Sequence, residues 1–501
     1  MSVTATARAT GLLAVSALLA ACGTRLPDRD FAVSGQVVDQ PGAVVPGASA
    51  GPSASASAVP GSTPGVTGPG GVTAGPSSGP GGGTGGGGAT ANFASDIGVT
   101  ATTVRLGLVS SRSNPFDPAA FIGTLFGAQA YFSDLNARGG VNGRQVQLTT
   151  CDDHGDGARN QTCIHSLIDD AKVFAFVSQA IFRYDGASYV QQKGVPDIGS
   201  QPIDTAYARY HHLWDLYGET YKRDGTTGYN GKLQGNTEVY RFFKEKFPKE
   251  PLKAGVVYYN EADSQRFGES IATGLRKEGY TVVTEQVNFA LPNFDSAVLD
   301  MKNQGVRFIF DTLDSGGNQN LCKAMDSGGL SSQAVAKVTT TQSWVASIAT
   351  DYSQSPLCRN KIWATGNTLN YEDTSKPQVK AFRDAMARQH TDGTSQMSEW
   401  AIEGWAGAQW ATDAIASCGA KLTRTCVETY MNRQESKWYN GHGMLTPRDF
   451  KVVEPAAPNS VNCINVARWQ DSFNGGRGGW VTQVPDMMKN CYDVPGILYS
   501  P

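Results

Sequence analysis

VRLGLVSSRSNPFDPAAFIGTLFGAQAYFSDLNARGGVNGRQVQLTT, residues 104–150, places a short apolar run, a polar loop, a helical pattern and a second apolar run in that order. The run 104–109 predicts a buried strand, and the loop 110–118 follows it. Residues 119–138 have the apolar periodicity of a helix that ends at Gly139-Gly140, where glycine takes the positive φ of a C-terminal cap. A strand–helix–strand order is typical of a parallel α/β sheet.

The same alternation continues along the chain in two series. The first adds strands near 173–177 and 195–198. The second predicts strands at 254–259, 281–287, 306–310 and 336–341, with helices at 267–278, 294–304 and 318–327 between them. Helices at 378–389 and 399–417 follow, with strand-like segments near 463–469 and 479–484. We therefore predict an α/β fold of two doubly wound, Rossmann-like lobes with a ligand cleft between them.

The chain before residue 97 has a different composition. Residues 23–92 hold 19 Gly and 9 Pro and one aromatic residue, Phe31, so they lack the apolar mass that offsets the entropy of ordering. We expect a disordered tether over 23–96. The GxSxG strings at 47–51 and 75–79 lie in this tract without the strand and helix of a nucleophile elbow, so they are accidents of composition.

The first 22 residues predict export. Arg8 precedes the apolar run Gly11–Ala21, which is too short to span a bilayer but suits a signal peptide. The run ends LAAC, which resembles the bacterial lipobox and predicts cleavage before Cys22 and lipidation of that residue. We expect a protein anchored by Cys22 to the outer face of the cytoplasmic membrane, attached to the membrane through lipid only.

Eight cysteines follow Cys22, and an even number in an exported chain indicates disulfides. Eight thiols allow 105 pairings. Of these we choose sequence neighbours: Cys151–Cys163, Cys322–Cys358, Cys418–Cys426 and Cys463–Cys491. Zinc is the competing interpretation, but no CxxC spacing occurs.

Ligands of open parallel sheets bind beyond the carboxyl ends of the strands, so the loops after strands are the candidate site. These loops are 110–118, 178–182, 200–204, 260–264, 311–316 and 341–344. They carry hydroxyls, amides, carboxylates and aromatic rings, which suit a small polar ligand.

Several segments together resemble the type 1 periplasmic binding proteins of the branched-chain amino acid class, the solute receptors of ABC importers. They are VRLGLV (104–109), LNARGGVNGRQVQL (135–148), KAGVVYYN (253–260), GLRKEGYTVV (274–283) and NFDSAVLDMKNQGVRFIF (293–310). The resemblance implies two lobes joined by three crossings and a ligand held between them without chemistry. It implies lobe 1 at 97–225 with 366–440, and lobe 2 at 226–365 with 441–501.

The resemblance also implies the roles of candidate ligand-binding residues. Hydroxyls and amides of the first lobe hold a carboxylate, an acid of the second lobe pairs with an ammonium, and aromatic residues wall the pocket. The candidates are Ser110, Ser111, Phe116, Ser178, Gln179, Ser200, Gln201, Tyr258, Asn260, Glu261, Asp311, Asp314, Gln342 and Trp344. The aromatic-rich stretch 207–229 departs from the family; it packs on the lobe surface or faces the cleft, where it favours a larger or aromatic ligand.

Charge and motifs limit the other functions. A formal charge of −3 gives no electrostatic case for nucleic acid. The cluster Asp152, Asp153, His154 and Asp156 is interpreted as a solvated loop rather than a metal site, and we expect no cofactor. We expect a non-enzymatic monomer that delivers its ligand to an ABC permease and ATPase. The alternatives are a sensor lipoprotein acting on a receptor and, less favoured, a lipid-anchored hydrolase.

Overall fold

Strands β1 (Thr103–Ser110) and β2 (Gln145–Asp152) pair in parallel along their whole length, as the opening pattern predicts. They belong to a five-stranded sheet, here the first sheet, in the order β2-β1-β3-β4-β5. Its other strands are β3 (Ala175–Val177), β4 (Asp197–Ser200) and β5 (Leu213–Asp215), and all neighbouring pairs are parallel.

The computed structural model describes residues 91–501 except 116, 340, 391–396, 434–439 and 448–449. All of these residues belong to one compact unit. The predicted signal peptide, Cys22 and nearly all of the predicted tether lie outside the described residues, as does the candidate Phe116.

Helices connect the strands of the first sheet. Asp117 caps α1 (Pro118–Ala137) by accepting a hydrogen bond from the backbone N–H of Ala120, and positive φ angles at Gly139 and Gly140 end the connection. The remaining connections are α2 (Gly157–His165) with the π-turn η1 (Ser166–Asp170), α3 (Ala187–Lys193) and the 3-10 turn η2 (Thr205–Ala208).

A second sheet of seven strands has the order β14-β13-β11-β10-β9-β7-β8. The strands β7 to β11 are parallel, and β13 and β14 are antiparallel additions at one edge. The strands are β7 (Lys253–Tyr259), β8 (Thr281–Val287), β9 (Phe308–Asp311), β10 (Ala336–Thr339), β11 (Ile362–Gly366), β13 (Asn465–Gln470) and β14 (Gly479–Thr482). Its helices are α4 (Glu238–Lys246), α5 (Ala262–Lys277), α6 (Phe294–Asn303), α7 (Ser315–Ser327), α8 (Leu330–Gln333), α9 (Ile348–Asp351), α10 (Pro356–Arg359) and α14 (Phe473–Gly476).

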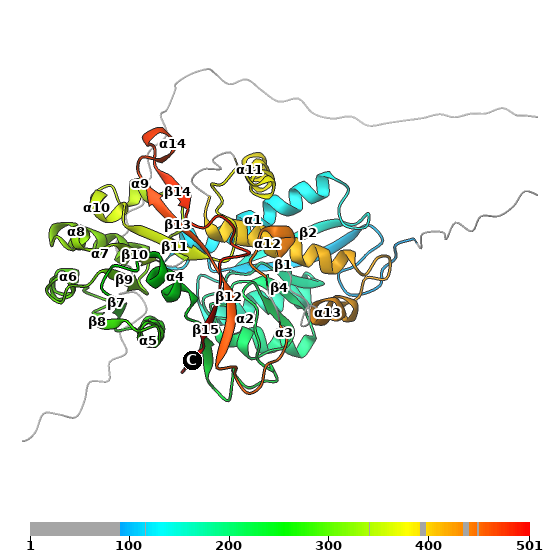
Figure 1. Ribbon diagram of the computed structural model, residues 1–501. Coiled ribbons are helices and arrows are strands. Elements are labelled where there is room, and N and C mark those ends of the chain that lie inside the picture. Colours follow the sequence, from blue (N-terminus) through cyan, green and yellow to red (C-terminus); the bar gives the residue numbers. More distant parts are fainter. Residues whose placement is uncertain (1–90, 116, 340, 391–396, 434–439, 448–449) are drawn as a thin grey trace, which may run out of the picture. The chain divides into compact units, whose positions relative to one another are not determined.

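The chain crosses between the sheets three times. It passes from β5 to β7, returns after β11 to the helices at 377–389 and 399–416, and crosses again between α13 (Arg424–Arg433) and β13. The helices α11 (Pro377–Gln389) and α12 (Glu399–Ala416) pack on α1, and α12 also contacts β4 (Figure 1). The two doubly wound lobes and the three crossings predicted from the sequence are therefore confirmed.

Glycine brings α12 and α1 together. A Cβ atom on Gly404 would lie 2.1 Å from the carbonyl oxygen of Thr124, and one on Gly127 would lie 1.8 Å from that of Ala401. Only glycine permits this approach of two backbones. The close packing explains why nearly the whole of α12 is buried although the first sheet ends at Asp215, far earlier in the chain.

The eight cysteines form the four predicted disulfides, which join Cys151 to Cys163, Cys322 to Cys358, Cys418 to Cys426 and Cys463 to Cys491. The last of these links β12 (Asn459–Cys463) to β15 (Cys491–Pro495), an antiparallel ladder outside both sheets. A second small ladder pairs β6 (Leu233–Gly235) with β16 (Ile497–Tyr499).

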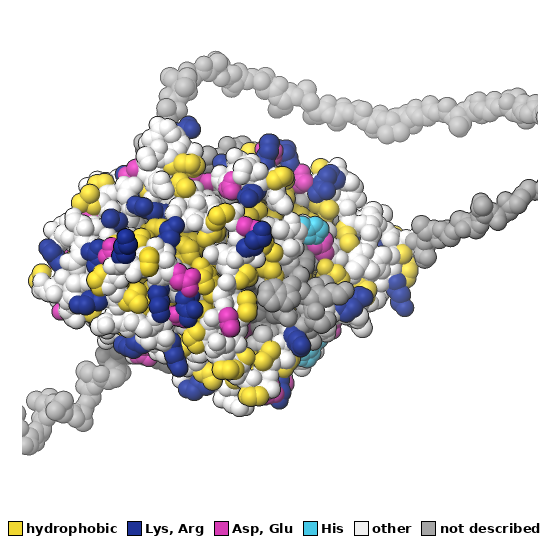
Figure 2. Space-filling view, in the orientation of Figure 1, with side chains coloured by type: hydrophobic (Ala, Val, Ile, Leu, Met, Phe, Trp, Pro, Cys, Tyr) yellow, Lys and Arg dark blue, Asp and Glu magenta, His cyan; other side chains and the backbone are white. Residues whose placement is uncertain are grey.

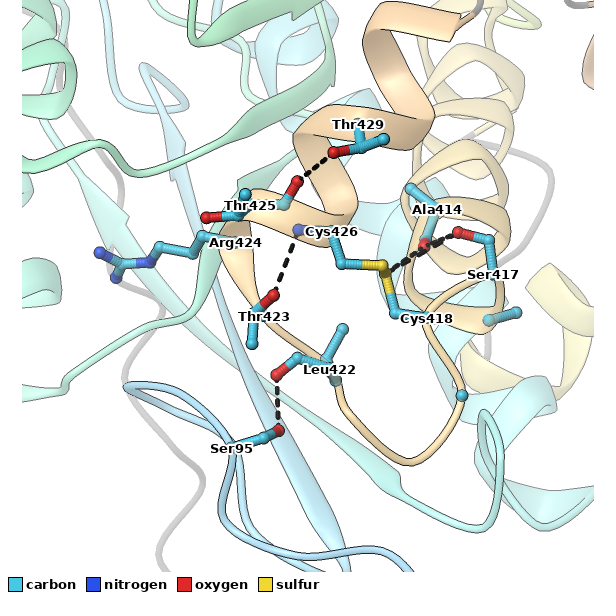
Figure 3. The surroundings of a disulfide bond; sticks show 12 residues. Ser95, Ala414, Ser417, Cys418, Leu422, Thr423, Arg424, Thr425, Cys426 and Thr429 are labelled. Atoms are coloured by element: carbon cyan, nitrogen blue, oxygen red, sulfur yellow. Dashed lines mark hydrogen bonds between the residues drawn. A yellow bond between two sulfur atoms is a disulfide. The ribbon is translucent and has the colours of Figure 1, made fainter. Parts of the chain in front are cut away.

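The Cys418–Cys426 disulfide closes the loop between α12 and α13 (Figure 3). Within this loop the carbonyl oxygen of Leu422 accepts a hydrogen bond from Ser95 at 2.5 Å. The guanidinium of Arg424 donates to the carbonyl oxygens of Val173 and Phe174, both at 2.9 Å. The loop thus fixes the first described residues of the chain against the amino end of β3, the opposite end of the sheet from the loops that were predicted to bind ligand.

Charged side chains of both signs are interspersed on the face shown in Figure 2, in agreement with the small formal charge. Among the described residues, no helix combines the length and the hydropathy that a bilayer crossing requires.

Candidate functional site

A cavity of about 330 Å³ lies between the two sheets, and we call it the main cavity. Its walls come from residues that follow strands β1, β3 and β4 of the first sheet and β7, β8, β9 and β10 of the second. The lining residues are Asp117, Phe121, Phe182, Arg183, Ile203, Asp204, Thr205, Tyr259, Glu261, Asp263, Ser264, Arg266, Phe267, Phe289, Thr312, Leu313, Asp314 and Gln342. The carboxyl ends of both sheets therefore meet at one cavity, as the topology of open parallel sheets predicts.

Five aromatic rings form the apolar part of the walls. Phe121 and Phe182 pack edge to face from the first sheet, with ring centroids 6.2 Å apart, and Tyr259 packs on Phe289 from the second at 5.1 Å. The guanidinium of Arg266 lies over the ring of Phe267, 4.6 Å from its centroid. A cavity with aromatic walls and a few polar groups is typical of small-molecule sites.

Four of the five carboxylates at the cavity cap helices. Asp117, Asp204, Glu261 and Asp314 each accept a hydrogen bond from a backbone N–H in the first turn of the helix that follows, so the fold itself places them at the cleft. Asp314 Oδ1 accepts from the N–H of Gly317 at 2.7 Å and from the hydroxyl of Tyr259 at 3.0 Å. No hydrogen bond occupies its other oxygen within the described residues, nor Oε1 of Glu261.

Two side-chain contacts cross the cavity, each between an element of the first sheet and an element of the second. Ser315 Oγ, at the start of α7, donates to Asp117 Oδ2 at 2.6 Å. Arg183, after β3, lies 3.9 Å from Asp263 of α5, and both side chains are partly exposed. Burial raises the pKa of Asp117, while the hydrogen bonds from Ser315 and Ala120 oppose that rise. These contacts join elements of the two sheets beside the main cavity.

Of the fourteen candidate binding residues, three line the main cavity: Glu261, Asp314 and Gln342. Asn260 supports the wall, because its Oδ1 accepts a hydrogen bond from the N–H of Phe289 at 2.9 Å. Tyr258 lies against α5, where a Cβ on Gly268 would meet its ring at 2.6 Å. Phe116 is outside the described residues.

The candidate hydroxyls after first-sheet strands are buried and bonded to protein. Ser110 donates to the carbonyl oxygen of Phe121 at 2.8 Å, and Ser178 donates to that of Gly404 at 2.9 Å. Ser111 donates to Asp153 at 2.6 Å and Ser200 to Asp197 at 2.5 Å. These hydroxyls tie the ends of the strands to α1, to α12 and to two buried aspartates. They do not line the main cavity.

The remaining candidates are buried as well. Gln179 donates to Asp197 at 2.7 Å, and Gln201 donates to Glu403 of α12. Asp311 forms an ion pair with Lys337 at 2.9 Å, with both side chains fully buried. The ring of Trp344 packs on Trp480. No group of three or more His, Cys, Asp or Glu in the described part of the chain is arranged to hold a metal ion.

Sequence reasoning missed most of the cavity's aromatic and basic residues, although Asp117, Phe182, Asp204 and Asp263 lie within the loops it selected. A usable signal was present: an acidic residue directly before a helix favours N-capping, and four such residues line the cavity. Phe267 lies in the second turn of α5, and Phe289 lies two residues after β8. Neither position has a capping residue type that would have marked it as part of the site.

Two mostly parallel sheets, joined by three crossings and sharing one cavity at their carboxyl ends, define a two-lobed ligand-binding protein. The family model described as "Periplasmic binding protein" matches residues 103–476, and the chain belongs to that family. The resemblance stated from the sequence is thereby confirmed. Membership implies an extracytoplasmic binding protein. No protein of curated function matches the chain in sequence.

Solved structures share the fold at low identity. A fatty acid ABC transporter substrate-binding protein from Thermomonospora curvata is 17% identical, with a TM-score of 0.60 over 80% of this chain and 97% of its own. A solute-binding protein of R. palustris in complex with 4-hydroxybenzoate has 13% identity and a TM-score of 0.59, covering 78% and 98%. The branched-chain amino acid binding protein of Streptococcus pneumoniae in complex with isoleucine has 16% identity and a TM-score of 0.55, covering 76% and 100%.

Proposed function

We propose that this protein is a lipid-anchored extracytoplasmic receptor that captures a small polar ligand between its two lobes and delivers it to an ABC importer. The observation that carries the proposal is the main cavity, about 330 Å³ in volume and walled by loops from the carboxyl ends of both sheets. Its volume is within the range of small-molecule pockets, about 300–1,000 Å³. The lobes comprise residues 97–225 with 366–440, and 226–365 with 441–501.

Ligand capture uses closure of the lobes. A ligand that contacts both walls stabilises the closed state by its differential affinity for that state. The hydrogen bond from Ser315 to Asp117 supports this step, because it forms only when the two lobes approach. The ligand then needs no chemistry from the protein, which acts as a receptor and not as an enzyme.

The charge of the cavity favours a ligand with an ammonium group. Five carboxylates and two guanidinium groups line it, and Asp314 Oδ2 and Glu261 Oε1 are available as charge-assisted acceptors. An amino acid or another primary amine is therefore the expected class. Arg183 and Arg266 are the cations that would meet a carboxylate on the same ligand.

Delivery requires partners. The lipid on Cys22 would hold the protein at the outer face of the cytoplasmic membrane, and a permease with its ATPase would accept the closed form. A sensor role would use the same closure to address a receptor instead. Transport of the ligand into cells, lost on deletion of this protein and restored by the wild-type chain, would distinguish an importer component from a sensor.

The first experiment is a thermal-shift screen of the full chain in detergent with amino acids, amines, aromatic acids, fatty acids and small peptides. A ligand that binds only the folded state raises the midpoint, by about 2.7 kcal/mol of stability at a hundredfold excess over Kd. The hit must be recovered unchanged, because turnover would identify an enzyme. If no compound shifts the midpoint, the receptor proposal fails for these classes of ligand.

A charge variant tests the ammonium site. Asp314→Asn retains the capping oxygen and removes the charge, so we expect affinity for an amine to fall about 10- to 100-fold. Asp156→Asn is the matched control, since Asp156 caps α2 in the same way, accepting from the N–H of Arg159 at 2.9 Å, and does not line the main cavity. Equal losses in both variants would count against the ammonium assignment.

A further inference from the structure

A smaller cavity of about 170 Å³ adjoins the main cavity. Five residues line both: Ile203, Asp204 and Thr205 from the first lobe, and Arg266 and Phe267 from α5. The two cavities are therefore adjacent, and movement of these shared side chains would let a ligand in the main cavity extend into the smaller one.

The walls of the smaller cavity are mostly aromatic and apolar. Tyr217 and Tyr221 come from the aromatic-rich stretch 207–229, and Tyr499 comes from β16 near the end of the chain. The Tyr217 hydroxyl donates to Glu403 at 2.9 Å, and the Tyr221 hydroxyl accepts from the N–H of Gln234 at 2.7 Å. With both hydroxyls bonded to protein, the rings of these tyrosines provide flat apolar surface.

Two polar atoms at this cavity lack a protein partner. Arg266 Nε and Gln234 Oε1 are each shielded from solvent and, within the described residues, neither has a hydrogen-bond partner. A buried donor or acceptor without a partner is costly, by about 1–3 kcal/mol each. Movement of either side chain toward a bound ring would let a polar substituent supply one of the missing hydrogen bonds.

Two acids also line the cavity: Asp204, on the wall shared with the main cavity, and Glu219. Burial raises the pKa of Glu219 well above its ordinary value, and the neighbouring charge of Asp215 adds to that rise. This rise favours the neutral carboxyl form, which costs less beside an apolar ring than a carboxylate does. The smaller cavity thus differs in character from the main cavity, where carboxylates gather.

We propose that the smaller cavity is a second subsite, which binds the aromatic ring end of an elongated ligand whose charged end occupies the main cavity. The inference rests on the proposed function and narrows its ligand class to aryl compounds longer than a single amino acid. Aromatic walls favour a ring because offset-stacked and edge-to-face ring pairs add attraction beyond the area they bury.

Two homologous series test the subsite on the full chain: ω-phenylalkylamines and ω-phenylalkanoic acids with one to six methylene groups. Both place one charge and one ring at increasing separation, so the test does not depend on the sign of the ligand charge. We expect Kd in one series to fall about fourfold for each methylene group that becomes buried, until the ring reaches the smaller cavity.

A variant that fills the smaller cavity tests whether the gain in affinity arises there. Ala208 lines the smaller cavity and is 3% exposed, so Ala208→Leu places extra volume where the ring would lie. We expect at least a tenfold loss of affinity for the longest binding member and less than a twofold change for the shortest. Ala387→Leu, on the exposed face of α11, is the matched control and should change neither. The unliganded melting midpoint of each variant verifies that it folds.

The other outcomes overturn the inference. Affinity that does not depend on chain length, or a length-dependent gain that survives Ala208→Leu, would place the ring elsewhere. If neither series binds while another compound of the thermal-shift screen does, the ring subsite is wrong and the receptor function stands. If nothing in the screen or the series binds, the receptor proposal itself fails.

Discussion

Ser315 and Asp117 join the two lobes by a hydrogen bond of 2.6 Å across the main cavity. Each residue also belongs to the start of a helix: Asp117 caps α1 and Ser315 is the first residue of α7. The helix ends that face the ligand therefore also form the contact that holds the lobes together. Closure and ligand binding depend on the same few residues.

Removing this contact should weaken ligand binding. A hydrogen bond to a charged group contributes about 1.5–3 kcal/mol, so Ser315→Ala should raise the ligand Kd about 10- to 100-fold by destabilising the closed state. Calorimetry with a ligand from the thermal-shift screen measures the change. The control is Ser331→Ala, which removes a similar bond, from Ser331 Oγ to Asp326 Oδ1 at 2.5 Å, within one lobe. Equal affinity in Ser315→Ala and the wild type would contradict the role of closure.

The buried ion pair between Lys337 and Asp311 should matter for stability. Both side chains are fully buried and lie 2.9 Å apart in the second sheet. Lys337→Met leaves an uncompensated buried carboxylate, so the free energy of unfolding should fall by about 3–5 kcal/mol. The double variant Lys337→Met/Asp311→Leu should recover most of that loss. Urea unfolding checks both variants, and a double variant less stable than the single one would refute the pairing.

The repeating elements of this fold are predictable from local sequence. The apolar runs at 281–287 and 254–259 match β8 and β7 to within one residue, and helix 399–417 matches α12 to within one residue. Local periodicity predicts these elements because each strand buries one face and each helix buries one stripe of its side chains. The disulfide pairing of sequence neighbours was also correct.

The directions of individual side chains at the site were not predictable in this way. Ser178 follows a strand in a selected loop, yet its hydroxyl is bonded to the carbonyl oxygen of Gly404. That contact depends on α12, which comes from 226 residues later in the chain. Loop positions follow from local sequence, but which loop residues face the ligand depends on packing between distant segments.

Stability should depend on pH through Asp197. Its burial raises the pKa to about 6, against an unfolded value of about 3.9. The native state therefore binds a proton at Asp197 more tightly than the unfolded state does. Between about pH 6 and pH 4, this group makes the free energy of unfolding rise as the pH falls, by up to ~3 kcal/mol.

The comparison of wild type with Asp197→Asn isolates this group, because an asparagine does not titrate. The variant replaces one carboxylate oxygen by an NH₂ group, so it loses the acceptor for either Ser200 or Tyr207 and should be less stable at every pH. The decisive quantity is the difference between the two unfolding free energies, which should grow as the pH falls from 6 to 4. Urea unfolding at four pH values measures it, and a constant difference would show that Asp197 titrates normally.

The Cys418–Cys426 disulfide should stabilise the fold without affecting ligand binding. It closes a short loop at the amino end of the first sheet, where Arg424 holds the carbonyl oxygens of Val173 and Phe174. The main cavity is at the opposite, carboxyl end of the strands. Cys418→Ala/Cys426→Ala should therefore lower the free energy of unfolding by about 2–3 kcal/mol and leave the ligand Kd within twofold.

The comparison variant is Cys151→Ala/Cys163→Ala, whose disulfide joins β2 to α2 close to the loops of the cleft. A change of Kd in the Cys418–Cys426 variant as large as in this one would show that the amino end of the sheet is coupled to the ligand site.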